Sequence, residues 1–115
     1  MSNTSDRHSA DGFLAACRTR RTVYSLAKCP QLSDERVIYL VHEAILHTPS
    51  SFNSQSTRAL VLLGDEHEHL WNDIAKPAVF AVAPKEVWLA SEKKLSAFAA
   101  AHGTVSLLTN QTLQY

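Results

Sequence analysis

The segment that follows the longest predicted helix is rich in uncharged polar side chains. It reads PSSFNSQ (residues 49–55) and continues as ST. Seven neutral hydrogen-bonding side chains stand together here: Ser50, Ser51, Asn53, Ser54, Gln55, Ser56 and Thr57. Hydroxyl and amide groups suit a neutral heterocycle whose edge alternates donors and acceptors. The same residue types are also ordinary in a turn after a helix. Composition alone therefore leaves a ligand-binding wall and a plain polar loop both open.

A second candidate lies upstream, in the arginine motif TRRT (residues 19–22). Two adjacent guanidinium groups and a threonine hydroxyl supply the forked donors that a phosphate accepts. The three glycines are Gly12, Gly64 and Gly103, so no glycine-rich phosphate loop exists. Basic residues at a helix end also complement the helix dipole. This motif is thus a phosphate site or a common helix end.

The histidines do not form a metal motif. His42 and His47 are five positions apart, so they project about 140° apart around a helix. His67 and His69 are two apart in a polar stretch, and no third ligand is suggested nearby. Metal-binding helices instead place histidines four positions apart, on one face. We therefore expect no metal site.

The length, net charge and amino-acid composition indicate the class of protein. The chain has 115 residues, a formal net charge of zero, 45% hydrophobic and 19% charged residues. These values are typical of one globular domain with no general attraction for nucleic acids or membranes. Cys17 and Cys29 form neither a CxxC motif nor a disulfide framework, and the first eleven residues lack the apolar run of a secretory signal. We expect a soluble protein of the cytoplasm, or of the cytoplasm and nucleus.

The elements that must position these residues alternate in type. Ser33 is a predicted N-cap, followed by acidic residues in the first turn of a helix that Pro49 ends. A strand is predicted over residues 58–63, and Gly64 ends it. Three further helices are predicted, over residues 11–20, 66–75 and 85–101, and a short strand is predicted over 104–108. Asp65 is expected to cap the helix over 66–75, in which Leu70, Trp71 and Ile74 face inward. An apolar connection is predicted between Pro77 and Pro84.

The predicted strand poses a structural problem. Its sequence, ALVLL (residues 59–63), is apolar on both faces, which is typical of a strand buried on both sides of a sheet. An isolated pair of strands is only marginally stable. One clear strand and one short strand do not complete such a sheet. Either another chain completes the sheet, or the sequence is the front part of a larger domain.

The order and spacing of these motifs resemble the nitroreductase family. The resemblance is to the small fungal and bacterial branch of this family, and it runs from about Phe13 to Gly103. The motifs that carry it are RRT after the first helix, then about ten residues later SDERVIYLVHEAILHTPSSFNSQSTRALVLL, and then EHEHLW. The resemblance implies an α+β fold with helices around a mostly antiparallel sheet. This chain would hold its N-terminal portion, with the sheet incomplete. It divides the chain into a flexible tail (1–10), a partial domain (11–103) and a divergent end (104–115).

The resemblance also implies a function. Family members are FMN-dependent flavoproteins and homodimers. Their flavin lies at the subunit interface and passes a hydride from NAD(P)H to a nitroaromatic, quinone or similar acceptor. The implied phosphate and ribityl contacts are Arg20, Arg21 and Thr22. The implied flavin contacts, made from the other subunit, are Pro49, Ser50, Ser51, Asn53 and Gln55. No catalytic side chain is implied, because the flavin supplies the chemistry.

Some features depart from the family pattern. Ser56 and Thr57 replace a proline and an aromatic residue, and Val23 and Tyr24 replace a second basic position. Family domains run to about twice this length, and the resemblance fades after Gly103. We therefore expect a truncated oxidoreductase that does not build a whole flavin site alone. Two alternatives remain: a non-catalytic remnant that dimerises with or mimics a full-length relative, and a cofactor-free helical binding module.

Overall fold

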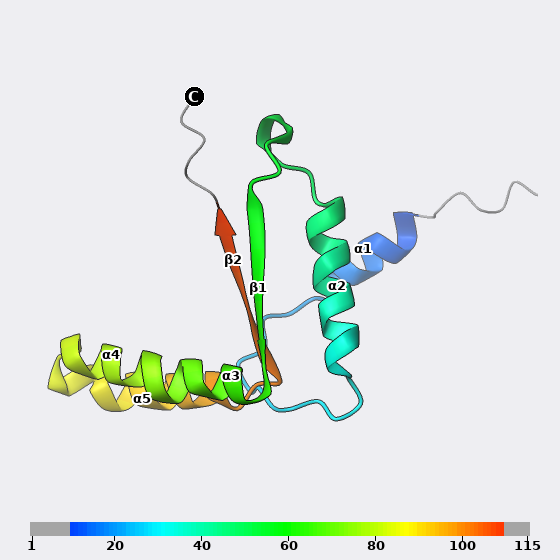
Figure 1. The fold of residues 1–115 in the computed structure, drawn as a ribbon. Helices are drawn as coiled ribbons and strands as arrows, with labels where there is room; N and C mark the ends of the chain where they lie inside the picture. The colour runs from blue at the N-terminus through cyan, green and yellow to red at the C-terminus, as the bar shows by residue number, and fades with distance from the viewer. Residues whose placement is uncertain (1–9, 110–115) are drawn as a thin grey trace, which may run out of the picture.

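The chain is built as a two-stranded β-ribbon with helices on one side and a long helical arm at its foot (Figure 1). This computed structural model describes residues 10–109. Its α+β class confirms the fold class predicted from the sequence. The predicted N-terminal tail (residues 1–9 of it) and the last six residues of the divergent end lie outside the described part.

Helices α1 (Ala10–Thr19) and α2 (Asp34–His47) precede the ribbon. The hydroxyl of Ser33 accepts a hydrogen bond from the backbone N–H of Arg36 at 3.2 Å, which confirms the predicted N-cap. At the other end Thr48 has an extended backbone (φ −82°, ψ 126°). Proline at position 49 disfavours the helical conformation of the residue before it, so α2 ends where predicted.

Strands β1 (Thr57–Leu63) and β2 (Gly103–Thr109) pair antiparallel along their whole length. Leu63 lies opposite Gly103, where a Cβ atom would come within 2.8 Å of the Leu62 carbonyl oxygen. Any larger residue at position 103 would therefore push the strands apart. Among the described residues these are the only two strands of the sheet, so the incomplete sheet predicted from the sequence is confirmed.

The arm consists of two antiparallel helical segments that leave the foot of the ribbon (Figure 1). The outgoing segment comprises α3 (Gly64–His69), a π-helical stretch η2 (Leu70–Ala75) and α4 (Lys76–Val82), and α5 (Lys85–Ala99) returns. The Trp71 and Phe98 rings lie 5.0 Å apart, and the Phe80 and Trp88 rings 4.9 Å apart. These two ring pairs join the outgoing and returning segments.

The helical course of residues 76–82 corrects the predicted apolar connection between Pro77 and Pro84. Proline normally breaks a helix because it lacks an N–H and its ring collides with the carbonyl four residues earlier. Here the turn before Pro77 is widened, and the N–H of Lys76 bonds the carbonyl of Trp71, five residues earlier. The wider turn moves the obstructing carbonyl aside. The helix therefore passes the proline without ending.

Two smaller expectations for the arm are also wrong. The helix begins at Gly64 rather than after an Asp65 cap, and the residue at its N-cap position, Leu63, provides no side-chain bond. Gly64 has φ +54°, a left-handed conformation that glycine adopts without strain and that turns the strand directly into the helix. Ile74 was expected to face inward, but it is 51% exposed. The π-helical stretch rotates the following residues away from the helical spacing that the prediction assumed.

A polar cluster joins the arm to β2. His67 is buried, with 1% of its surface exposed. Its Nε2 lies 3.1 Å from the carbonyl oxygen of Ala99, which can only accept, so Nε2 carries the hydrogen. Its Nδ1 therefore accepts from the Thr104 hydroxyl at 2.8 Å, and that hydroxyl accepts from Trp71 Nε1 at 2.8 Å. Every polar atom of this cluster has a partner when His67 is neutral.

The connection from α1 to α2 is also fastened to the arm and its base. Lys28 Nζ lies 2.7 Å from Glu68 Oε1. Their mutual hydrogen bond raises the pKa of Lys28 and lowers the pKa of Glu68. The backbone N–H of Cys29 donates to Nδ1 of His102 at 3.3 Å, and His102 Nε2 lies 3.3 Å from the Asp34 carboxylate. The start of α2 is thereby held to the turn between α5 and β2.

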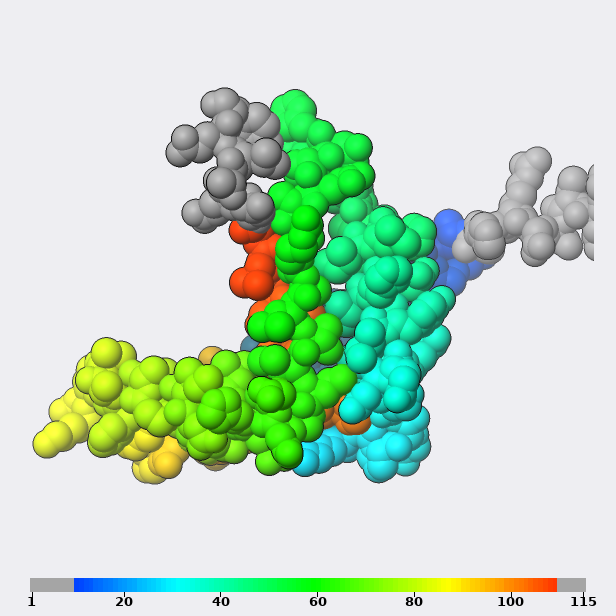
Figure 2. All heavy atoms as spheres, in the orientation of Figure 1, coloured from blue at the N-terminus to red at the C-terminus, as the bar shows by residue number. Residues whose placement is uncertain are grey.

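The described part of the chain contains no buried hydrophobic residue. The radius of gyration is 19.0 Å, whereas a compact domain of this length has about 13 Å. In the space-filling view the arm and the ribbon meet at the foot of the ribbon and then diverge (Figure 2). The large apolar side chains of both strands, α2 and the arm thus form surfaces rather than a closed core.

The hydroxyl of Thr104 is predicted to fix the arm on the ribbon. Thr104→Val keeps the shape but leaves the half-buried donor of Trp71 and the acceptor of the buried His67 unpaired, so it should lower the free energy of unfolding by about 1–3 kcal/mol. Urea unfolding followed by tryptophan fluorescence measures this, since Trp71 and Trp88 both lie in the arm. Thr104→Ser keeps the hydroxyl and is the matched control. Equal effects of the two substitutions would contradict this role.

Candidate functional site

A cavity of about 780 Å³ lies between the C-terminal half of α2, the PSSFNSQ segment and the ribbon. Its volume is within the range of about 300–1,000 Å³ that is usual for small-molecule sites. The lining residues are Val41, Ala44, Ile45, Leu46, His47, Thr48, Pro49, Ser50, Asn53, Gln55, Thr57, Arg58, Val105 and Leu107. No carboxylate is among them, and apolar side chains from α2 and β2 form much of the wall.

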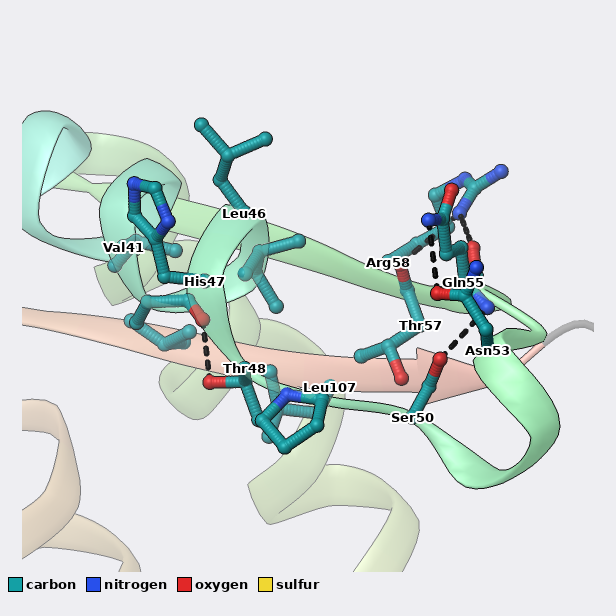
Figure 3. A pocket seen from close by; sticks show the side chains of 14 residues that line it. Val41, Leu46, His47, Thr48, Ser50, Asn53, Gln55, Thr57, Arg58 and Leu107 are labelled. Atoms are coloured by element: carbon teal, nitrogen blue, oxygen red, sulfur yellow. Dashed lines mark hydrogen bonds between the residues drawn. The ribbon is translucent and has the colours of Figure 1, made fainter.

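Five polar side chains gather at one end of the cavity, those of Ser50, Asn53, Gln55, Thr57 and Arg58, whereas His47 lies near Val41 and Leu46 at the other end (Figure 3). Ser50 Oγ accepts from the backbone N–H of Gln55 at 2.9 Å, and Asn53 Oδ1 accepts from Gln55 Nε2 at 3.1 Å. These bonds leave the Ser50 O–H and the Asn53 NH₂ group as donors and the Gln55 side-chain oxygen as an acceptor. The cavity therefore has a polar end with donors and an acceptor, where Arg58 also lies, and a largely apolar end formed by α2.

The backbone of the polar end is held in an uncommon conformation. Phe52, Asn53 and Gln55 have φ values of 53°, 54° and 50°, in the left-handed region. That region is disfavoured for side chains other than glycine and asparagine, and each such residue costs about 1–3 kcal/mol. The hydrogen bond of Ser50 to Gln55 spans the whole turn, and Asn53 N–H bonds the Ser50 carbonyl at 2.9 Å. The turn contains the short 3₁₀-type segment η1 (Ser51–Asn53), in which Phe52 departs from helical dihedral angles, and these bonds span it.

The structure brings together only part of the residue set predicted from the sequence. Pro49, Ser50, Asn53 and Gln55 line the cavity, whereas Ser51, Arg20, Arg21 and Thr22 do not. The Ser51 carbonyl accepts from Ser54 N–H at 3.1 Å within η1. In one copy of the chain, then, the arginine motif and the PSSFNSQ segment do not share a wall.

The arginine motif lies at the end of α1 and is exposed. Arg21 NH1 donates to the carbonyls of Arg18 and Arg20, both at 2.8 Å, and Arg20 NH1 lies 3.5 Å from the Thr22 hydroxyl. The bond to Arg18 satisfies one of the carbonyls that a helix leaves unpaired at its C-terminus, and the bond to Arg20 lies just beyond the helix. The remaining guanidinium donors of Arg20 and Arg21 are available to a ligand. The assignment of the motif to a phosphate therefore stays a prediction.

Sequence reasoning missed the charged residue of the cavity. Arg58 NH1 donates to the carbonyls of Gln55 at 2.9 Å and Thr57 at 3.0 Å, so the guanidinium folds back over the turn. It also missed the apolar walls, Val41 and Ile45 of α2 and Val105 and Leu107 of β2. The helical spacing of the α2 residues was a signal for a buried face, but nothing local in the sequence shows that β2 would pair here.

Residues 10–109 contain neither a cluster of metal ligands nor a helix that could span a membrane. No group of three or more histidine, cysteine, aspartate or glutamate side chains there could hold a metal ion. His42 and His47 instead flank the carboxylate of Glu43, at 3.6 and 3.4 Å. Within the same range, none of the helices is long and apolar enough to cross a bilayer.

The arrangement can be compared with known proteins. The sequence profile of the nitroreductase family matches residues 17–113. The chain belongs to the nitroreductase family. This match covers α2, the cavity, the ribbon and the arm together, and it confirms the family resemblance on which the sequence interpretation depends.

Similar nitroreductases come from a yeast and a bacterium. Nitroreductase FRM2 of Saccharomyces cerevisiae is 37% identical over 75 residues, which are 64% of this chain and 39% of the yeast protein. Nitroreductase CinD from Lactococcus lactis, in complex with chloramphenicol, has a TM-score of 0.72 and 35% identity over 86% of this chain and 48% of its own. A nitroreductase structure from Saccharomyces cerevisiae has a TM-score of 0.68 and 30% identity, covering 88% and 54%. The chain spans about half the length of these solved relatives and 39% of the length of FRM2.

The hydroxyl of Ser50 is predicted to hold the turn. Ser50→Ala removes the acceptor of the Gln55 N–H, a bond whose net contribution is about 0.5–1.5 kcal/mol. Amide hydrogen exchange at Gln55 should accelerate by about twofold to tenfold. Ser51→Ala is the matched control, because the turn uses the backbone of Ser51. If the Ser51 variant accelerates exchange as much, the Ser50 hydroxyl does not hold the turn.

Proposed function

We propose that this chain contributes to the FMN site of a nitroreductase-type oxidoreductase. In this site NAD(P)H is the hydride donor, and a nitroaromatic, quinone or similar small molecule is the acceptor. The observation that carries the proposal is the polar end of the cavity, where the uncharged side chains of Ser50, Asn53 and Gln55 lie together and no carboxylate lines the wall. Family membership supports the reaction type, and a relative of known structure, CinD, has been crystallised in complex with 4-nitrophenol.

The cavity fits one wall of a flavin. A flavin ring is flat and largely apolar, and its pyrimidine edge alternates hydrogen-bond acceptors with a donor. The Asn53 NH₂ group and the Ser50 O–H would donate to that edge, and the Gln55 oxygen would accept from it. The apolar residues Val41 and Ile45 line the same cavity, where ring carbon atoms would be shielded from water. The rigid left-handed turn keeps the polar groups in place before the ligand arrives, which reduces the entropy lost on binding.

The chain's own residues bind and orient rather than react. Bound FMN supplies the hydride-transfer chemistry. Asn53, Ser50 and Gln55 fix the position of the ring edge, and the apolar wall excludes water from one side of the ring. Arg58 reinforces the turn through the Gln55 and Thr57 carbonyls and brings a positive charge to the cavity. We assign no catalytic acid or base to this chain.

The separation of the two predicted contact sets supports a site shared by two subunits. Arg20, Arg21 and Thr22 do not line the cavity of their own chain. A homodimer would allow the arginine motif of one subunit to hold the FMN phosphate while the PSSFNSQ segment of the other, Ser51 included, lies against the flavin ring. Guanidinium forks and a hydroxyl suit a phosphate, and amides suit the ring edge.

Asn53→Ala tests the ring contact. It removes two N–H donors, so FMN affinity should fall by about 1–3 kcal/mol, which is roughly 5- to 150-fold in Kd. The protein for this test joins residues 1–109 to the part of CinD that has no counterpart here, and FMN fluorescence titration gives the affinity. Ser91→Ala is the matched control, since the Ser91 hydroxyl bonds Val87 in the arm. An unchanged Kd for the Asn53 variant would contradict a flavin wall at this segment.

Arg20→Ala tests the phosphate contact in the same chimaera. A charge-assisted hydrogen bond contributes about 1.5–3 kcal/mol, so FMN affinity should fall roughly 10- to 150-fold. Riboflavin lacks the phosphate, and its affinity should remain within about twofold. Isothermal titration with both flavins measures the difference. Equal losses for FMN and riboflavin would show that the motif only ends α1.

A further inference from the structure

The outer end of the helical arm carries an apolar run that takes no part in the cavity. Residues 77–84 read PAVFAVAP, a stretch without a single polar side chain. We propose that this end of the arm is a docking site for the surface of an anionic lipid bilayer, which it enters as far as the boundary between headgroups and acyl chains. The proposal does not rest on the flavin site, because the run and the cavity share no residue.

The apolar run is exposed where packing would normally cover it. Phe80 and Val82 are 63% and 82% exposed, and Leu89 on the returning helix α5 is 76% exposed. Among the described elements α4 packs against η2 and α5, and neither the ribbon nor α2 makes a comparable contact with it. The turn between α4 and α5 lies at the end of the arm farthest from the ribbon (Figure 1). An exposed run of this kind is typical of an interaction site.

The shape of this apolar surface favours a bilayer over a groove on a protein. A helix that packs against a protein usually presents one apolar stripe about 100° wide. Successive residues of a helix are about 100° apart, so the exposed side chains from Phe80 round to Val82 cover about 200° of α4. The exposed members within α4 are Pro77, Ala78, Phe80, Ala81 and Val82. A groove would leave many of them in water, whereas the headgroup and acyl boundary of a bilayer surrounds an element that enters it.

The backbone of the run also suits surroundings that contain little water. N–H groups that lose contact with water need partners inside the protein. Pro77 and Pro84 have no N–H, and the residues from 78 to 82 lie in a helix that continues from η2. The N–H of Ala83 bonds the carbonyl of Val79 at 2.8 Å. No N–H group of the run therefore depends on water.

The charges around the run are mainly positive. Lys76 and Lys85 lie immediately before and after it. Residues 76–94 contain four lysines and two glutamates, a net charge of +2, whereas the whole chain is neutral. The salt bridges within residues 10–109 include none of these six side chains. Lysine stems can lie along an apolar surface while their ammonium groups reach lipid phosphates, so the charge complements an anionic bilayer.

Vesicle flotation with residues 1–115 tests the proposal. Vesicles of phosphatidylcholine with about 30% phosphatidylserine should carry the chain to the top of a density gradient, where aggregated protein does not rise. Vesicles of phosphatidylcholine alone should bind about tenfold more weakly, since lysines near an anionic surface favour binding. Raising the salt concentration to about 0.5 M should remove most of this difference, because it screens the lysines.

The two tryptophans show which part of the chain meets the lipid. Trp88 packs on Phe80 towards the end of the arm, whereas Trp71 packs on Phe98 nearer its base. Brominated phosphatidylcholine in the anionic vesicles should quench the emission of Trp88, which enters the headgroup boundary with the run. Trp88→Phe keeps an aromatic ring against Phe80, and its remaining emission, from Trp71, should stay almost unquenched.

Two matched substitutions place a carboxylate at different exposed valines. Val82→Glu puts it on the apolar run and should weaken vesicle binding by about tenfold or more, because a charge is costly to bury and anionic lipid repels it. Val23→Glu makes the same change beside the arginine motif, where Val23 is 60% exposed, and should leave binding within about threefold. Neither side chain is buried, so both variants should keep the fold.

Four results would overturn the proposal. The chain could stay at the bottom of the gradient with both kinds of vesicle. Val23→Glu could weaken binding as much as Val82→Glu, which would assign the binding to the basic end of α1. Trp71 could be quenched as strongly as Trp88, which would mean that the chain enters the lipid as a whole. A soluble oligomer that ignores vesicles and that Val82→Glu separates would assign the run to a second copy of the chain.

Discussion

The pairing of β1 with β2 is the constraint on which the rest of the structure depends. It brings Thr57 opposite Thr109 and Leu63 opposite Gly103, from segments at either end of the arm. β1 supports α2, and β2 supplies Val105 and Leu107 to the cavity wall. β2 also carries Thr104, whose hydroxyl forms hydrogen bonds with His67 and Trp71 of the arm. Without this ladder the cavity loses one wall and the arm loses its base.

Polar groups fix positions in this chain where apolar packing would normally do so. The most buried side chain among the described residues is a histidine, and its neutral form satisfies Thr104, Trp71 and Ala99 together. The turn at Ser50 is likewise held by hydrogen bonds, against the backbone preference of the left-handed residues Phe52 and Gln55. Such directional contacts set geometry without a closed core. The large apolar side chains of the described residues remain at the surface.

Local signals in the sequence predicted the elements well. The cap at Ser33, the stop at Pro49 and the break at Gly64 act within a few residues, and the structure confirms all three. The course past Pro77 was not predictable from proline chemistry, because a widened turn five residues long relieves the clash. For the candidate site, the PSSFNSQ segment was found from its residue types. Arg58 and the β2 side chains were missed because their place depends on a pairing between distant segments.

The ladder also closes a long loop, and this bears on the order of folding. Leu63 pairs with Gly103, so the whole arm lies inside the closure. Closing a loop of about forty residues costs more chain entropy than forming the turns of a helical hairpin, whose contacts are local. We therefore expect the arm to form before the ribbon, through Trp71 with Phe98 and Phe80 with Trp88, and to shorten the distance between the two strands before they pair. On this expectation the helical arm is a folding template for the ribbon at its base.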